Sequence, residues 1–176
     1  MIREAASLAN VKSRMRRILM RWLYPLVDQV VVLTDYMSHE LQGALGLSGR
    51  KISVIGNPID VDRIRALVEE RVESQKTNSW KPYLLSIGRL AEQKDFSTVI
   101  KAFALLCRDM DLNLVILGDG PQRQMLEELV ADLGLTARVH MPGRVKNPYP
   151  WLARASVFVL SSRWEGYPNV LLEAQY

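Results

Sequence analysis

The chain has 176 residues, of which 48% are hydrophobic and 24% are charged. This length suits about one ordinary domain, and this apolar share excludes a disordered or low-complexity protein, which could not bury enough apolar surface to fold. The net charge of +4 is concentrated at the amino terminus, where residues 1–25 hold six Lys and Arg residues against Glu4 alone. The rest of the chain is nearly neutral, so the charge does not indicate a nucleic-acid-binding protein.

The chain shows no sign of a secreted or membrane-spanning protein. Cys107 is the single cysteine, which rules out an intramolecular disulfide and favours a reducing compartment, where the thiol packs as a small hydrophobe. No stretch approaches the ~18 consecutive apolar residues of a membrane-spanning helix, and residues 1–10 lack the apolar core of a signal peptide. We therefore expect a cytoplasmic protein.

Residues 12–26 have the pattern of a basic amphipathic helix. Arginines alternate there with apolar residues at spacings of three and four. Two interpretations stay open. The helix could lie peripherally on the anionic inner face of a membrane, or it could cover a sheet with its charges in solvent.

The next segment predicts short elements separated by turns. Apolar runs at residues 30–33 and 52–55 are typical of buried strands, and residues 38–47 between them are typical of a helix. Asn57-Pro58-Ile59-Asp60 interrupts the pattern, because the residue before proline is pushed away from the helical region. A charged helix at 62–72 then leads into the polar residues 73–79, an exposed linker or loop.

A regular alternation of strands and helices follows. Nearly unbroken apolar runs predict strands buried on both faces, at residues 83–87, 114–117, 139–141 and 157–160. Helical patterns at 96–107 and 122–133 lie between the first three strands. Strands that alternate with helices of this length form parallel sheets, so the sequence predicts a Rossmann-like α/β domain with helices on both faces.

Glycine or polar side chains follow each of these four strands, at the edge where such sheets bind ligands. Gly88 would let a backbone approach a ligand closely, and Arg89 and Lys94 offer positive charges suited to a diphosphate. A helix that opens near Asn169 would present free N–H groups at the same edge, and Glu173, about one turn inside it, could accept hydrogen bonds from a ribose diol. Together these groups predict a nucleotide-diphosphate site.

Four motifs occur in order along the chain and include two glutamates separated by seven residues. They are Asn57-Pro58-Ile59-Asp60, Gly88-Arg89-Leu90 with Gln93-Lys94, Gly118-Asp119-Gly120-Pro121, and Glu165-Gly166-Tyr167-Pro168-Asn169-Val170-Leu171-Leu172-Glu173-Ala174. With these motifs the chain resembles glycosyltransferase family 4, whose members are retaining enzymes of the GT-B fold, from about Val30 to Ala174.

The resemblance implies a role for each candidate residue. Arg89 and Lys94 would neutralise the diphosphate of a UDP- or GDP-linked sugar, and Glu165 would contact the transferred sugar. Glu173 would hold the ribose hydroxyls. The remaining donor-binding groups would be Gly88, the base-binding loop with Arg144 and Val145, and the backbone amides of Asn169, Val170 and Leu171.

The implied reaction is transfer of a hexosyl or N-acetylhexosaminyl group to a glycan or lipid-linked acceptor, with retention at the anomeric carbon. The nucleotide sugar is the substrate, and neither a metal nor another cofactor is expected. Residues 1–57 resemble only the end of the family's acceptor-binding domain, 58–81 a linker and helix, and 82–176 a truncated donor-binding domain. Alone, the chain is expected to be weakly active or inactive, with strand edges at 30–33 and 52–55 exposed to self-association.

Other interpretations fit less well. A nicotinamide-dependent dehydrogenase needs its Gly-x-Gly-x-x-Gly motif after the first strand, whereas Gly118-Asp119-Gly120 follows the second. Asp109 and Asp111 form an Asp-x-Asp pair, but they precede a strand and would face the wrong edge for a metal-dependent transferase. His39 and His140 have no ligand partners at suitable spacing. A non-catalytic module that binds a nucleotide sugar or a partner protein remains open.

Overall fold

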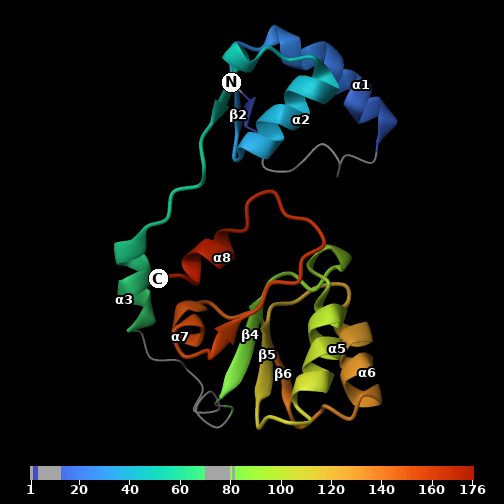
Figure 1. Ribbon diagram of the computed structural model, residues 1–176, viewed down its shortest axis with the longest axis vertical. Coiled ribbons are helices and arrows are strands. Elements are labelled where there is room, and N and C mark those ends of the chain that lie inside the picture. Colours follow the sequence, from blue (N-terminus) through green and yellow to red (C-terminus); the bar gives the residue numbers. More distant parts are fainter. Residues whose placement is uncertain (1, 4–12, 70–79, 81) are drawn as a thin grey trace. The chain divides into compact units, whose positions relative to one another are not determined.

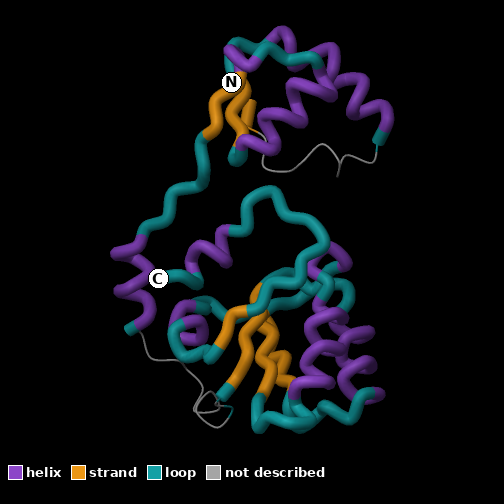
Figure 2. The backbone as a smooth tube through the Cα atoms, viewed as in Figure 1, coloured by secondary structure: helices purple, strands orange, loops and turns teal. Residues whose placement is uncertain are grey.

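The computed structural model describes residues 2–3, 13–69, 80 and 82–176. The chain divides into two compact units, and each holds one of the two sheets seen in Figure 2. Unit 1 contains Met1–Ile59 together with Glu165–Asn169, and unit 2 contains Asp60–Trp164 and Val170–Tyr176. The segment 165–169, which we expected in the donor-binding domain, therefore belongs to the compact unit of the amino-terminal residues.

Unit 1 has a three-stranded parallel sheet in the order β1-β2-β3, formed by β1 (Ile2–Arg3), β2 (Val30–Val32) and β3 (Ile52–Val54). The predicted exposed edge at 30–33 is wrong, because β2 is paired on both sides and all three of its residues are buried. The sequence assigned no element to residues 1–10, so the strand that covers this edge was missed. The predicted self-association stays a prediction.

The described part of unit 1 also contains two helices and two 3-10 turns: α1 (Arg14–Leu23), Tyr24–Leu26, α2 (Asp35–Leu45) and Gly49–Lys51. Helix α2 begins three residues before the expected position, because the Thr34 side chain accepts a hydrogen bond from the Met37 amide. Helix α1 contributes little to the core, since Met20 is its one buried residue.

Unit 2 confirms the predicted parallel sheet. The strands follow the order β6-β5-β4-β7, with β4 (Tyr83–Ile87), β5 (Asn113–Leu117), β6 (Val139–Gly143) and β7 (Val157–Phe158) all parallel. Helices α5 (Phe96–Leu106) and α6 (Arg123–Asp132) cover one face, and α7 (Tyr149–Leu152) covers the other (Figure 1). The domain is therefore a Rossmann-like sheet with helices on both faces.

The side chains of each central strand alternate between two apolar clusters. Leu84 and Leu114 pack beneath α5 and α6, whereas Tyr83, Leu85 and Val115 pack with Trp151 of α7 on the opposite face. Because both faces are covered, β4 and β5 are apolar at every position except Ser86 and Asn113, which explains the nearly unbroken runs in the sequence.

Three shorter elements among the described residues lie outside this layered core: α3 (Val61–Val68), a 3-10 turn at Glu92–Lys94, and α8 (Asn169–Glu173), of which Asn169 belongs to unit 1 and the rest to unit 2. Helix α3 ends before the expected Val72, and the expected linker at 73–79 lies outside the described residues. Cys107 is half-buried against the α5/α6 cluster, as expected for a small hydrophobe. Among the described residues, no helix is long and apolar enough to cross a membrane.

Candidate nucleotide-binding site

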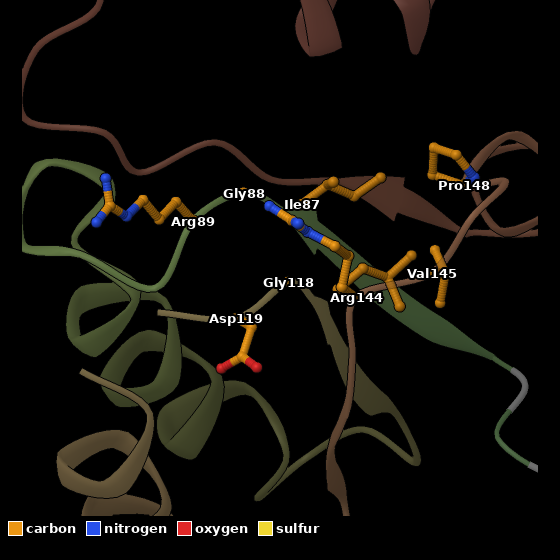
Figure 3. Close-up of a pocket in the computed structure, with 9 residues that line it drawn as sticks. Ile87, Gly88, Arg89, Gly118, Asp119, Arg144, Val145 and Pro148 are labelled. Carbon is orange, nitrogen blue, oxygen red and sulfur yellow. The ribbon is translucent and has the colours of Figure 1, made fainter. Parts of the chain in front are cut away.

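A pocket opens at the carboxyl ends of the central strands of unit 2, where a ligand site was predicted (Figure 3). The ends of β4 and β5 form one side, and the loop between β6 and α7 forms the other. Four predicted donor-binding residues line it, Gly88, Arg89, Arg144 and Val145, together with Ile87, Leu117, Gly118, Asp119 and Pro148.

The floor of the pocket is glycine backbone because two strand ends approach each other closely. The Gly118 amide donates to the Gly143 carbonyl at 2.9 Å, and the Gly88 amide donates to the Leu117 carbonyl at 3.0 Å. A Cβ atom added at Gly118, whose φ is +144°, would lie 1.9 Å from the Gly88 carbonyl oxygen. Only glycine fits at this position, and the bare backbone can approach a bound phosphate.

Three cationic side chains lie around this floor. The Arg144 guanidinium extends toward Gly88, whereas that of Arg89 extends away from Arg144 (Figure 3). Lys94 packs its stem against Gly88, since a Cβ added there would lie 3.3 Å from the Lys94 Cδ and Cε atoms. The resemblance assigned Arg144 to the loop that binds the nucleotide base. In the structure its guanidinium extends toward Gly88, which belongs to the predicted diphosphate site.

Asp119 is the acidic residue of the pocket lining, and its carboxylate is turned away from Arg144 (Figure 3). It accepts a hydrogen bond from the Gly120 amide at 2.8 Å and lies 3.9 Å from the Arg123 guanidinium. Both contacts lie on the side of the carboxylate away from Arg144, so Asp119 does not pair with the cation on the other side of the pocket. The Gly-Asp-Gly-Pro turn contained the signal for this lining residue, although its role was not predicted.

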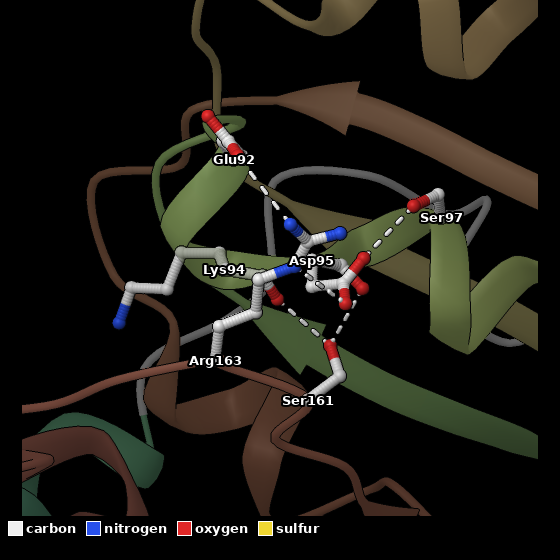
Figure 4. Close-up of polar contacts among 6 residues, drawn as sticks. All are labelled: Glu92, Lys94, Asp95, Ser97, Ser161 and Arg163. Atoms are coloured by element: carbon white, nitrogen blue, oxygen red, sulfur yellow. Dashed lines mark hydrogen bonds and ion pairs between the residues drawn. The ribbon is translucent and has the colours of Figure 1, made fainter.

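A polar clamp holds the turn that carries Lys94 (Figure 4). We define the Arg163 clamp as Glu92, Asp95, Ser161 and Arg163. Arg163 donates from Nε to Asp95 at 3.1 Å and from Nη1 to Glu92 at 3.3 Å. The Ser161 hydroxyl donates to the backbone carbonyls of Lys94 and Asp95, at 2.8 and 3.0 Å.

The clamp fixes an uncommon backbone conformation. Asp95 has φ +46°, and it is the one non-glycine residue with positive φ in the described chain. Hydrogen bonds from Arg163 and Ser97 hold the pKa of its carboxyl below the ordinary value. Sequence analysis missed the clamp because Asp95 and Arg163 lie 68 positions apart and only the fold brings them together.

Glu173 lies near the α7 end of the pocket. Burial raises the pKa of its carboxyl. Burial also raises the pKa of Tyr149, and the Glu173 charge raises it further. Because Tyr149 directly follows the pocket residue Pro148, Glu173 is close to this side of the site.

The other predicted residues are divided between the units. Val170 and Leu171 belong to unit 2, like the pocket, whereas Glu165 and Asn169 belong to unit 1. There the Asn169 side-chain oxygen accepts a hydrogen bond from Asn57 at 2.8 Å. The approach of Glu165 and Asn169 to the donor stays a prediction.

Two residues considered as possible metal ligands, Asp111 and His140, contact other protein side chains. Asp111 pairs with Arg138 at 3.5 Å, next to the start of β5 rather than its carboxyl end. His140 stacks on Trp80 at 4.1 Å and hydrogen-bonds to Asn113, and burial lowers its pKa. Within the described ranges, no three His, Cys, Asp or Glu side chains gather as a metal site would require.

A parallel α/β sheet with a cationic, glycine-floored pocket at its carboxyl edge is the arrangement of a Rossmann-type domain. The family model described as "Glycosyl transferases group 1" matches residues 68–176, and the model described as "Glycosyltransferase Family 4" matches residues 5–63. The chain belongs to the group 1 glycosyl transferases, and its sheets form part of a GT-B fold.

Known relatives are longer. An uncharacterized glycosyltransferase of Methanocaldococcus jannaschii is 32% identical over 157 residues, covering 88% of this chain but 39% of the relative. The N-acetylgalactosamine-N,N'-diacetylbacillosaminyl-diphospho-undecaprenol 4-alpha-N-acetylgalactosaminyltransferase of Campylobacter jejuni is 31% identical over 165 residues, covering 94% and 43%. The chain thus spans about two fifths of these curated relatives.

Solved structures share the fold at low sequence identity. The crystal structure of Anabaena HepE in complex with UDP has a TM-score of 0.82 at 17% identity, and the match covers 98% of this chain and 50% of HepE. The apo form of the lipopolysaccharide outer core galactosyltransferase WaaB has a TM-score of 0.68 at 22% identity, covering 96% and 44%.

Proposed function

We propose that unit 2 binds the diphosphate of a nucleotide sugar and provides the donor side of a glycosyltransferase. The observation that carries this proposal is the pocket itself, whose lining combines a glycine floor at Gly88 and Gly118 with Arg89 and Arg144, while the Lys94 stem packs against Gly88. Glycine backbone allows phosphate oxygens to approach, and the cations balance their charge.

A UDP-linked sugar is proposed as the donor in preference to a GDP-linked sugar, because HepE, which shares this fold, was crystallised with UDP. The apolar side chains of Val145 and Pro148 offer a surface for the base. Glu173, near this side of the pocket, would accept hydrogen bonds from the ribose hydroxyls.

The proposed reaction is glycosyl transfer with retention. Negative charge develops on the diphosphate as the sugar departs, and preorganised cations would stabilise that charge in the transition state. Glu165 would contact the sugar, and backbone amides at 169–171 would complete the phosphate site. The leaving phosphate would help to deprotonate the acceptor hydroxyl on the same face, so Glu165 would not act as a nucleophile.

The acceptor is proposed to be a glycan, in particular a lipid-linked one. The Campylobacter relative is named for transfer to a diphospho-undecaprenol-linked sugar, which supports this class. Residues 1–57 would then be part of the acceptor-side domain and residues 82–176 part of the donor-side domain.

Calorimetric titration of the folded chain with UDP, UMP and uridine tests the donor site. UDP should bind at least tenfold more tightly than UMP, because the second phosphate adds charge-assisted hydrogen bonds of about 1.5–3 kcal/mol each. Parallel titrations with GDP identify the preferred base. A folded chain that binds neither UDP nor GDP would overturn the proposal.

Variants locate the diphosphate within the pocket. Arg89→Ala, Lys94→Ala and Arg144→Ala should each weaken UDP binding about tenfold or more. Arg108→Ala is the matched control, because this exposed arginine follows α5 at the opposite edge of the sheet. Equal losses in the control and the pocket variants would contradict the placement. If Arg144→Ala weakens uridine as much as UDP, Arg144 serves the base rather than the diphosphate.

Binding and catalysis are separate claims. A transfer or hydrolysis assay with UDP-sugars distinguishes an active enzyme from a module that only holds the donor. Turnover that Lys94→Ala abolishes would support the enzyme. Tight UDP binding without turnover would support the non-catalytic module for this chain.

A further inference from the structure

Helix α1 exposes most of its apolar side chains. We define the α1 stripe as Met15, Ile18, Leu19, Trp22 and Leu23. Met15 is 80% exposed and Trp22 is 75% exposed, and the other three are between 48% and 60% exposed. An amphipathic helix normally turns such a face toward its own core, and α1 does not.

The arrangement follows from helix geometry. With 3.6 residues per turn, successive side chains are rotated by about 100°, so the α1 stripe occupies one sector of roughly 140°. Met20 and, just after the helix, Tyr24 point to a different sector, and these two residues are buried in the core of unit 1. Helix α1 is therefore anchored along one edge and leaves its apolar face uncovered within the described chain.

Arginines border the stripe on both sides. By the same rotation, Arg14 and Arg21 lie along one border and Arg16 along the other. All three are exposed, and α1 contains no acidic residue. Long arginine side chains can lay their stems along an apolar surface while the guanidinium groups reach lipid headgroups, and tryptophan is favoured at this depth.

We propose that α1 docks on an anionic phospholipid surface, with the α1 stripe in the acyl boundary and its arginines among the headgroups. The positive charge along the α1 stripe favours a membrane over a protein as its binding partner. A protein segment or a second copy would have to supply acids on both borders of an apolar groove, whereas an anionic bilayer supplies both features at once. The proposal does not depend on donor binding in unit 2.

Vesicle co-sedimentation of the whole chain tests the proposal. Vesicles of phosphatidylcholine mixed with phosphatidylglycerol should bind the chain, and vesicles of phosphatidylcholine alone should bind it at least tenfold more weakly. The triple variant Arg14→Gln/Arg16→Gln/Arg21→Gln should lose about fivefold per arginine, roughly 100-fold in all. Arg17 stays unchanged because it makes an interaction within the protein.

A second variant tests the apolar contribution. Leu19→Ser/Trp22→Ser should also lower binding to the anionic vesicles by at least tenfold, because burial of apolar side chains in the bilayer adds to the attraction of the charges. These side chains are 56% and 75% exposed, so the fold should persist, and circular dichroism checks that it does.

The matched control removes three positive charges from exposed positions of unit 2. The variant Arg65→Gln/Lys101→Gln/Arg108→Gln should stay within about threefold of the unchanged chain, although its net charge equals that of the α1 triple variant. An equal loss in both triple variants would overturn the proposal, as would failure to bind anionic vesicles. A dimer in sedimentation equilibrium that Leu19→Ser/Trp22→Ser dissociates would assign α1 to self-association instead.

Discussion

Gly118→Ala tests whether the close approach of two strand ends builds the pocket floor. The added Cβ would lie 1.9 Å from the Gly88 carbonyl oxygen and 2.9 Å from its carbonyl carbon, so backbone must move. Overpacking of this kind costs about 1–3 kcal/mol or more. The φ of +144° adds about 1–3 kcal/mol, because side-chain-bearing residues rarely adopt it. We expect unit 2 to lose about 4 kcal/mol of unfolding free energy.

Urea denaturation monitored by tryptophan fluorescence measures this loss, since Trp151 is buried in the unit 2 core. Gly134→Ala is the control in the same unit. Its φ is +68°, but an added Cβ would meet no atom within 4 Å, so only the left-handed backbone costs free energy, about 1–2 kcal/mol. If Gly118→Ala were no more destabilising than Gly134→Ala, the close approach would not be a constraint and our account of the floor would be wrong.

The remaining predictions concern the clamp and pH. Arg163→Ala should weaken UDP binding about tenfold by releasing the Lys94 turn, whereas Arg138→Ala, which breaks an exposed ion pair, should leave affinity within about twofold. The Asp95 pKa is lowered in the folded state, so its stabilisation is present above about pH 4 and lost as the pH falls through the lowered pKa; urea midpoints should show a smaller acid loss in Asp95→Asn. Burial lowers the His140 pKa, so protonation favours unfolding as the pH falls below about 6.5; an unchanged pH profile in His140→Gln would contradict this.

The local pattern of the sequence was sufficient to predict the parallel sheet of unit 2 and helices α5 and α6, although not α7. Unbroken apolar runs of strand length, separated by helical periodicity, specify buried parallel strands whatever the rest of the chain does. The carboxyl ends of parallel strands meet at one edge, so the same pattern predicted that Gly88 and Arg144 line one pocket. Both inferences depend on the alternation of strand and helix patterns along the sequence, which short segments reveal without knowledge of distant contacts.

Contacts between distant segments were decided by the tertiary structure alone. The Arg163 clamp joins positions 68 apart, and the Asn57–Asn169 hydrogen bond joins positions 112 apart. The periodicity of residues 12–26 predicted a helix, yet it could not tell whether the apolar face of α1 turns inward or outward. Periodicity defines which side chains share a face, but the packing of neighbouring elements determines where that face points, and this choice leaves the α1 stripe exposed.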